Sequence, residues 1–353
     1  INCKSCRVVC PAGIDVSEEI LKRRAERPNR LTGPIFELQA NRSGFFERGL
    51  KLLAWTQPLW DRRPIRYLIE TLTRPFLRLL APTARIPRDL VLPRLARRHL
   101  RERHAGRVKT EGGVAYFHGC AANYFDDGVG DAVIELLSHF GVDAVLPPQR
   151  CSGTPIQTYG HADRVRENAR FNLASLAPFS MVVTGCASCT FMLKDYPSLF
   201  PDGPEKRAAE ALSKKVMHVT EYLVKELKVE LPSTLGESHP PTERVTYHSS
   251  CHLRAAGVTR EPRRLLQSLP GVSYVEMTDA DRCAGGAGTF CVKNPEMSRR
   301  IFERKRRGID ESGAEVVATS CPACMVQLNS GLRGSARVRH VAQVLLERLK
   351  VRK

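Results

Sequence analysis

Short apolar runs alternate with longer amphipathic stretches over most of the 353-residue chain. The runs at 114–117, 181–183 and 245–247 are rich in β-branched and aromatic residues and predict strands. The stretches at 131–140 and 162–176 predict helices between them. Strands that alternate with helices indicate parallel sheets with helical crossovers, and such sheets bind ligands at the carboxyl ends of their strands.

The segment before these strands is strongly basic. Residues 42–109 hold 17 Lys and Arg against 5 Asp and Glu, a net +12 of the chain's +18. Trp55 and Trp60 flank Pro58 in this segment, and Pro75 should kink or end a predicted helix further on. The charged residues of that helix recur at steps of four and share one face; they are Arg66, Glu70, Arg74 and Arg78.

A basic amphipathic segment with tryptophans is typical of an element that lies on an anionic membrane surface. The alternative is a linker whose apolar faces pack on neighbouring domains while its basic face is solvated. Both interpretations stay open from the sequence. No stretch of 18 or more apolar residues runs without a charge, so no membrane-spanning helix is predicted. Basic charge alone is weak evidence for nucleic-acid binding, and we expect none.

Eight of the 12 cysteines form two sets with nearly the same spacing. Successive steps are 31, 35 and 3 residues in the first set and 32, 38 and 3 in the second. The flanks repeat too, since Arg-Cys-Ser-Gly at 150–153 aligns with Arg-Cys-Ala-Gly at 282–285. The sequence therefore holds two tandem copies of one metal-binding unit. The first set is Cys120, Cys151, Cys186 and Cys189, and the second is Cys251, Cys283, Cys321 and Cys324.

Three further cysteines open the chain. Cys3, Cys6 and Cys10, followed by Pro11, form the tail of the ferredoxin run C-x2-C-x2-C-x3-C-P. In that run Cys3 and Cys6 would ligate one 4Fe-4S cluster and Cys10 a second; a zinc knuckle is the alternative. The first cysteine of the run would stand just before Ile1, so we expect missing sequence upstream. No signal peptide is recognisable, and this favours metal over disulfides.

The metal of the two repeated sets stays open on spacing alone. A structural zinc site usually has two close cysteine pairs, whereas each set here has one C-x2-C pair and two solitary cysteines. We expect each set to converge on one site that holds a 4Fe-4S cluster, with zinc possible in one of the two domains. Cys291 is expected to pack as a small apolar residue, and the glycine run at 285–288 is expected to point backbone N–H groups at the sulfur of a cluster.

Three histidines lie close to the repeated cysteines in the sequence: His118, His248 and His252. They could ligate metal, but we expect them instead to support the thiols through bonds to the backbone. No Ser-His-Asp order and no flavin or dinucleotide fingerprint stands out in the sequence. The chain is therefore expected to carry electrons without having a dehydrogenase active site of its own.

Several motifs carry a resemblance to a known family. His118-Gly119-Cys120, Cys151-x-Gly153-x-Pro155 and Cys189-Thr190-Phe191 are similar to the first CCG domain in the cysteine-rich subunit of bacterial anaerobic glycerol-3-phosphate dehydrogenase. Tyr247-His248-x-x-Cys251-His252 and Cys321-x-x-Cys324 resemble the second. The same pair of domains occurs in iron–sulfur subunits of lactate and glycolate oxidases and in heterodisulfide reductases.

The chain departs from this family at one position in each repeat. The family's Cys-Cys-Gly reads Cys151-Ser152-Gly153 in the first repeat and Cys283-Ala284-Gly285 in the second. Each set therefore has four thiolates, which suffice for an ordinary 4Fe-4S cube or for zinc. The missing cysteines count against five-cysteine clusters and against the disulfide-cleaving chemistry of the reductase branch.

The sequence as a whole predicts an α/β protein with two tandem cysteine-rich domains. A helical ferredoxin-type remnant occupies 1–41 and a basic amphipathic linker 42–112. The cysteine-rich domains occupy 113–242 and 243–353, and the polar stretch at 232–241 separates them.

The resemblance implies an electron-transfer subunit of an oxidoreductase complex in anaerobic respiration. It would pass electrons from an FAD-containing dehydrogenase subunit to membrane quinone, and would lie in the cytoplasm on the inner face of the cell membrane. Glycerol 3-phosphate is the substrate that the resemblance implies for the partner. An iron–sulfur subunit of a lactate or glycolate oxidase, or a heterodisulfide-reductase-like subunit, is the alternative.

Overall fold

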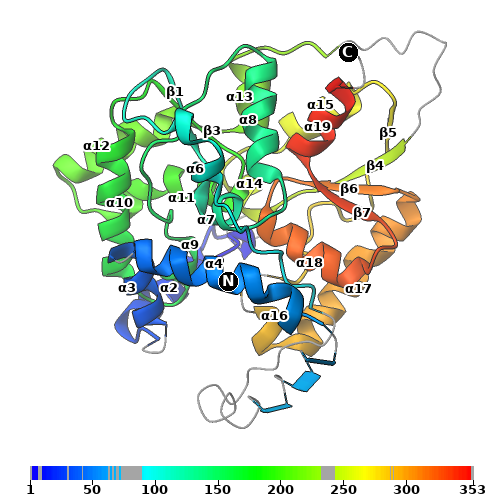
Figure 1. The fold of residues 1–353 in the computed structure, drawn as a ribbon, viewed down its shortest axis with the longest axis horizontal. Coiled ribbons are helices and arrows are strands. Elements are labelled where there is room, and N and C mark those ends of the chain that lie inside the picture. The colour runs from blue at the N-terminus through cyan, green and yellow to red at the C-terminus, as the bar shows by residue number, and fades with distance from the viewer. Residues whose placement is uncertain are drawn as a thin grey trace.

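The computed structural model describes residues 2–6, 10–29, 32–41, 43–62, 90–231, 243–286 and 290–350, with isolated residues at 64, 65, 67, 68, 71, 72 and 288. Two α/β lobes lie side by side, and the N-terminal helices run along one edge of the molecule (Figure 1). Most of the helix predicted around Pro75 and the whole predicted break at 232–241 lie outside the described residues.

The first lobe is built on a parallel sheet with the strand order β1-β2-β3. Ala115 of the first strand also forms an isolated parallel bridge with Val145 on its other side. The strands are β1 (Val114–Phe117), β2 (Met181–Thr184) and β3 (Val216–His218). The helices are α7 (Gly119–Tyr124), α8 (Val129–His139), α9 (Thr154–Thr158), α10 (Ala162–Leu176), α11 (Ala187–Lys194), η2 (Tyr196–Leu199), α12 (Pro204–Lys215) and α13 (Val219–Lys225).

The second lobe contains a four-stranded parallel sheet with the order β5-β4-β6-β7. Its strands are β4 (Glu243–His248), β5 (Val272–Tyr274), β6 (Val316–Thr319) and β7 (Arg337–His340). Its helices are α14 (Cys251–Ala255), α15 (Glu261–Gln267), α16 (Phe290–Lys293), α17 (Pro295–Ser312), α18 (Pro322–Leu332) and α19 (Val341–Lys350). The predicted α/β class with parallel sheets is confirmed.

The two sheets repeat one plan. Strands β1, β2 and β3 correspond to β4, β6 and β7, and the bridge at Val145 takes the place of β5. Cys120 follows β1 and Cys251 follows β4 by three residues each, while Cys186 and Cys321 each come two residues after β2 and β6. The repeated cysteines therefore leave equivalent strands at the carboxyl edge of each sheet, as ligand-binding residues do in parallel sheets.

One apolar core joins the two lobes. Helix α8 buries Val133 and Leu137 on the face that meets α19, and α19 contributes Val341 and Leu345 to the same buried cluster. The two helices lie side by side between the sheets (Figure 1). Because both helices carry apolar residues at three-to-four-residue spacing, each can cover its own sheet and still pack on the other helix.

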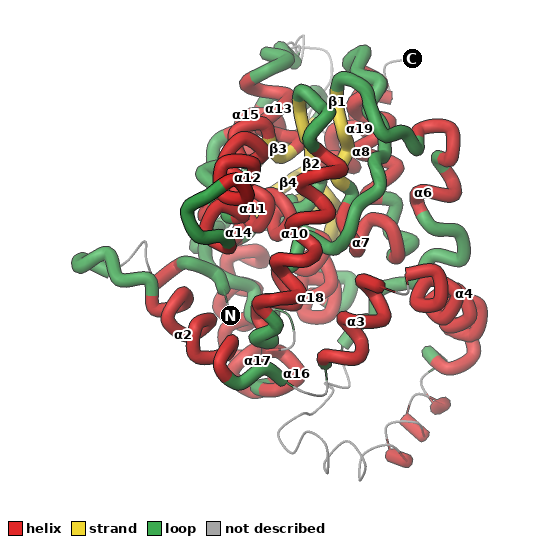
Figure 2. Tube along the Cα trace, turned by 90° about the vertical axis from the view of Figure 1, so that its left-hand side faces the viewer, coloured by secondary structure: helices red, strands yellow, loops and turns green. Residues whose placement is uncertain are grey.

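The N-terminal part consists of helices that lie against the first lobe. They are α2 (Val16–Glu26), α3 (Gly33–Asn41) and α4 (Ser43–Trp60), with the short α6 (Leu100–Arg103) and η1 (Ala105–Arg107) preceding β1. The Asp15 carboxylate caps α2 by accepting from the Glu18 N–H at 3.1 Å. Figure 2 shows α4 at the outer edge of the molecule. Among the described residues, no helix is long and apolar enough to span a bilayer.

Candidate metal centres

The thiols of the first set gather where α7, α9 and α11 begin. The Cys120 and Cys151 thiols hydrogen-bond to each other, and so do those of Cys186 and Cys189. The Ser152 hydroxyl donates to Cys189 Sγ at 3.6 Å, which links the second pair to the chain beside Cys151. The Cys120–Cys151 hydrogen bond and burial raise the pKa of the Cys120 thiol well above its ordinary value.

Gly119 allows this close approach. Its backbone is left-handed, with φ +66°, and a Cβ added there would lie 2.7 Å from Cys189 Sγ. A side chain at this position would therefore push the Cys189 thiol away. A cavity of about 260 Å³ adjoins the glycine and is lined by Cys120, Cys151 and His118 among others. Four thiols are the donors that a 4Fe-4S cluster or zinc requires, but only Cys120 and Cys151 of this set line the cavity.

Buried polar side chains hold the loop that carries Cys151. Asn172 of α10 accepts from the Arg150 N–H at 2.8 Å and donates to the Arg150 carbonyl at 3.2 Å. Asn168, one turn earlier, donates to the Cys151 carbonyl, and the Tyr196 hydroxyl donates to the Ser152 carbonyl. The sequence reasoning missed these residues. Two asparagines four residues apart inside a predicted helix are the signal, because asparagine is a poor helix former.

The second set has one hydrogen-bonded pair and two thiols near it. The free thiols of Cys321 and Cys324 form a hydrogen bond with each other. Burial, with the neighbouring thiols of Cys283 and Cys321, raises the pKa of Cys251 to about 12. The Gly285 N–H donates to Cys283 Sγ at 3.2 Å. Cys283 is exposed and Cys321 is buried, so this site opens to solvent at one side.

The two sets meet at the junction of the lobes. The Cys186 thiol hydrogen-bonds to Cys321, and this bond, with that of Cys324, holds the pKa of Cys321 well below its ordinary value. The Ala187 N–H donates to the Ser320 carbonyl at 2.9 Å. The second copy cannot donate the equivalent hydrogen bond to the first. Its counterpart of Ala187 is Pro322, which has no backbone N–H.

The three histidines near the cysteines are neutral; His118 and His252 bond to their surroundings, whereas Nδ1 of His248 has no hydrogen-bond partner among the described residues. His118 Nδ1 donates to the Gly119 carbonyl at 2.7 Å, and His252 Nε2 donates to the Asn2 carbonyl at 2.6 Å. The other ring nitrogen of His252 bonds to the Ser188 hydroxyl at 2.8 Å. Burial lowers the pKa of His118 to about 4 and that of His248 to about 3. For His118 and His252 this matches the expected bonds to the backbone.

Cys3 of the N-terminal segment lies close to the second set. The Asn2 amide donates to the Gln157 side chain at 3.1 Å, while its carbonyl binds His252, so the segment bridges both lobes. Cys3 is near enough to raise the pKa values of Cys251 and Cys283, although burial raises both more. The Cys10 N–H donates to the Cys6 carbonyl at 2.9 Å.

Cys291 lies apart from the two sets on α16. It is buried, and its thiol donates to the Gly288 carbonyl at 3.5 Å, as expected of a packed small residue. In the part of the chain that the structure describes, no group of three or more His, Cys, Asp or Glu side chains is arranged to hold a metal ion.

Comparison with known proteins places the chain in a family. The model of the CCG cysteine-rich domain matches residues 114–194 and 245–329. Lactate utilization protein A of Exiguobacterium sp. AT1b is 33% identical over 245 residues, which cover 67% of this chain and 98% of that protein. The chain belongs to the CCG cysteine-rich domain family.

Two Bacillus subtilis proteins are also similar to this CCG-family chain. Its lactate utilization protein A is 31% identical over 242 residues, covering 67% of this chain and 99% of that protein. Its probable glycolate oxidase iron-sulfur subunit is 28% identical over 374 aligned residues, covering 98% of this chain and 81% of that subunit. Among solved structures, a hypothetical protein from Helicobacter pylori is 12% identical with a TM-score of 0.45, over 69% of this chain and 50% of that one.

These relatives correct the finer part of the expected resemblance. The sequence motifs pointed to glycerol-3-phosphate dehydrogenase, whereas the similar proteins are named for lactate and glycolate. The physical reason is that the motifs consist of cysteines, glycines and their immediate neighbours. Such residues are set by the metal-binding unit that all branches share, and they carry no information on the substrate of a partner protein.

Proposed function

We propose that this chain is an iron–sulfur electron-transfer subunit of an oxidoreductase complex that oxidises lactate or glycolate. The observation that carries the proposal is the junction of the lobes, where Ser188, beside Cys189 of the first set, brings its hydroxyl within 3.8 Å of Cys321 Sγ of the second. A chain of closely spaced redox groups is what electron transfer requires. The names of the lactate and glycolate relatives support the choice of substrate class.

The residues that would hold clusters are the eight repeated cysteines and, in the ferredoxin-type segment, Cys3, Cys6 and Cys10. When bound, a 4Fe-4S cluster supplies one-electron oxidation and reduction at a potential set by its surroundings. The two sets of ligands would be Cys120, Cys151, Cys186 and Cys189, and Cys251, Cys283, Cys321 and Cys324. Zinc in one set is the second candidate for that set, because four thiolates also suit a tetrahedral zinc site.

The chain's own residues would tune these sites. The Ser152 hydroxyl and the Gly285 N–H donate to sulfur, and such bonds stabilise negative charge on thiolates. Burial of Cys151, Cys186 and Cys321 excludes water from the junction. The buried histidines are neutral and add no positive charge near the sulfurs at neutral pH.

The proposed partners are an FAD-containing dehydrogenase subunit, which would supply the electrons, and a membrane quinone, which would accept them. A flavin takes a substrate's electrons as a pair, and one-electron centres can pass them on singly. The chain would then act on the cytoplasmic face of the cell membrane as a peripheral protein. The substrate site would lie on the flavoprotein, so this chain would contribute electron transfer to the enzyme complex.

The test is substrate-driven reduction in the native complex. The chain is purified anaerobically with its associated flavoprotein from detergent-extracted membranes, and the visible absorbance is followed after lactate, glycolate or glycerol 3-phosphate is added. We expect bleaching with lactate or glycolate and none with glycerol 3-phosphate. Bleaching by glycerol 3-phosphate alone, or by none of the three in a complex that dithionite still bleaches, would contradict the proposal.

A further inference from the structure

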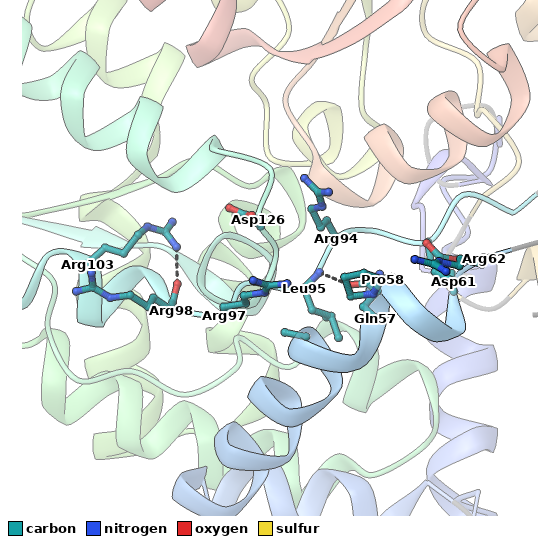
Figure 3. A pocket seen from close by; sticks show the side chains of 12 residues that line it. Gln57, Pro58, Asp61, Arg62, Arg94, Leu95, Arg97, Arg98, Arg103 and Asp126 are labelled. Carbon is teal, nitrogen blue, oxygen red and sulfur yellow. Dashed lines mark hydrogen bonds between the residues drawn. The ribbon is translucent and has the colours of Figure 1, made fainter. Parts of the chain in front are cut away.

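A basic cavity of about 760 Å³ lies between α4 and the segment that leads to α6 (Figure 3). Five arginines and only two aspartates line it, so its lining is positively charged. The charged lining residues are Arg62, Arg94, Arg97, Arg98, Arg103, Asp61 and Asp126. Gln57 of α4 fixes one wall, because its side chain donates to the Pro93 carbonyl at 3.1 Å and accepts from the Leu95 N–H at 2.8 Å.

The arginines of this cavity differ in their partners. The charge of Arg103 is already paired, because its guanidinium forms an ion pair with Asp131 at 2.7 Å and donates to the Arg98 carbonyl at 2.6 Å. The Arg97 guanidinium lies over the Trp55 ring, 4.3 Å from its centre. No ion pair between described residues neutralises Arg94 or Arg98. The cavity therefore has cationic groups to offer an anion.

Helix α4 carries an exposed apolar stripe beside this cavity. Phe45, Leu52, Trp55 and Leu59 are 68%, 68%, 61% and 58% exposed. At 3.6 residues per turn these four lie within about 80° of arc. Buried Ala54 and the Gln57 anchor lie on the opposite side of the helix. A surface helix normally turns its apolar stripe inward, so this stripe has no partner within the described fold.

Trp55 connects the stripe to the cavity. Its ring belongs to the exposed stripe and lies under the guanidinium of Arg97, which lines the cavity. An apolar helix face flanked by tryptophan and arginine is the arrangement of a helix that lies in the headgroup region of an anionic bilayer. Arg48, exposed on the same helix, can extend its charge to the phosphates while its stem stays among apolar groups.

We propose that α4 and the arginine cavity form a docking surface for a bilayer of anionic phospholipid. The stripe enters the boundary of headgroups and acyl chains, and a lipid phosphate occupies the cavity near Arg94 and Arg98. Charge complementarity favours lipid over a protein partner, because the segment at 42–109 carries a net +12 and the cavity concentrates part of it. This inference rests on the proposed function, which requires delivery of electrons to a membrane.

The test is co-sedimentation of the purified chain with vesicles of phosphatidylcholine, with or without phosphatidylglycerol. We expect binding to the mixed vesicles and little to pure phosphatidylcholine, with high salt weakening the binding without abolishing it. The double variant Arg94→Gln, Arg98→Gln should lose about 30-fold in affinity, from about 1 kcal/mol per cation near an anionic surface. The control Arg207→Gln, Lys214→Gln, with the same charge loss on distant α12, should keep wild-type affinity.

The apolar part has its own variant. Leu52→Gln with Leu59→Gln should remove the salt-resistant binding and leave the melting temperature unchanged, because both side chains are exposed. Equal binding to both kinds of vesicle, or binding that survives the Arg94 and Arg98 changes, would overturn the proposal. Binding to neither vesicle would instead assign the surface to a protein partner. Substrate-driven bleaching in detergent does not depend on this surface, so the two proposals can fail separately.

Discussion

Single residues without side chains decide how closely the thiols approach. Gly119 adopts φ +66° and leaves room for Cys189 Sγ, which a Cβ would approach to 2.7 Å. Gly141 adopts a similar φ of +77°, yet nothing lies within 4 Å of its hypothetical Cβ. The two glycines share a backbone requirement and differ in whether a thiol is their neighbour. This difference separates backbone strain from damage to the proposed metal site.

We expect Gly119→Ala to lower the iron content of the purified protein, because the new methyl group displaces the Cys189 thiol. Gly141→Ala should keep the iron content and lose about 1 kcal/mol of stability, the usual cost of a left-handed alanine. Iron per chain and the urea midpoint measure the two effects. Equal iron content in the two variants would show that the contact between Gly119 and Cys189 does not matter for the site.

At the scale of elements, α10 acts as a platform for the Cys151 loop. Asn172 is fully buried and satisfies both the N–H and the carbonyl of Arg150. The helix thus connects the stability of the lobe to the position of one proposed ligand.

Asn172→Ala should lower the free energy of unfolding by up to about 6 kcal/mol, since it removes the partner of two part-buried backbone groups, and each such group costs about 1–3 kcal/mol when buried unsatisfied. It should also reduce the iron content, because the loop that carries Cys151 loses its support. Glu167→Ala, at an exposed position of the same helix, should change neither quantity. Urea unfolding and iron analysis of the two variants check this; normal iron in Asn172→Ala would contradict the role of the platform.

The elements themselves were well predicted where the pattern is local. Strand β1 and helix α10 have the bounds that the sequence predicted, because apolar periodicity and strand-forming residues depend on near neighbours. The sequence could not predict whether the apolar stripe of α4 is buried or exposed, since the same amphipathic pattern occurs in a helix that packs inward and in one that binds a membrane. The asparagine supports were missed because they join residues about 20 positions apart.

On the scale of the whole molecule, the sequence predicted two copies of a unit but not how they meet. The spacing of the cysteines indicated the duplication, and the repeated strand order agrees with it. The contact between Cys186 and Cys321 and the shared core of α8 and α19 depend on packing between residues more than 100 positions apart. No periodicity in a sequence reports such contacts.

Buried histidines at this junction make stability sensitive to acid. His340 ends β7, and its ring lies 6.2 Å from that of His218 across the lobes. Burial lowers the pKa of His340 to about 4, from an ordinary 6.5. Below pH 6.5 the unfolded chain therefore binds a proton that the folded chain does not. The stabilisation is complete above pH 6.5 and is lost as the pH falls towards 4.

At pH 5.5 this one histidine should cost about 1 kcal/mol relative to neutral pH. His340→Asn removes the titrating imidazole. The asparagine side chain can still accept a hydrogen bond from the Ala342 N–H, as His340 Nδ1 does at 3.2 Å. We expect the variant to be less stable at pH 7.5 because of its smaller side chain, but to lose less stability on going to pH 5.5. Urea midpoints at the two pH values test this; an unchanged pH dependence would be against it.

The proposed function requires that the two repeated cysteine sets bind separate iron–sulfur clusters. The most direct measurement is the iron and acid-labile sulfide content, with the visible spectrum, of anaerobically purified wild type, Cys120→Ser, Cys251→Ser and Cys291→Ser. We expect a brown wild-type protein that dithionite bleaches, a partial loss of iron and absorbance in each of the first two variants, and no loss in Cys291→Ser. A colourless protein, or full iron and absorbance in both Cys120→Ser and Cys251→Ser, would contradict it.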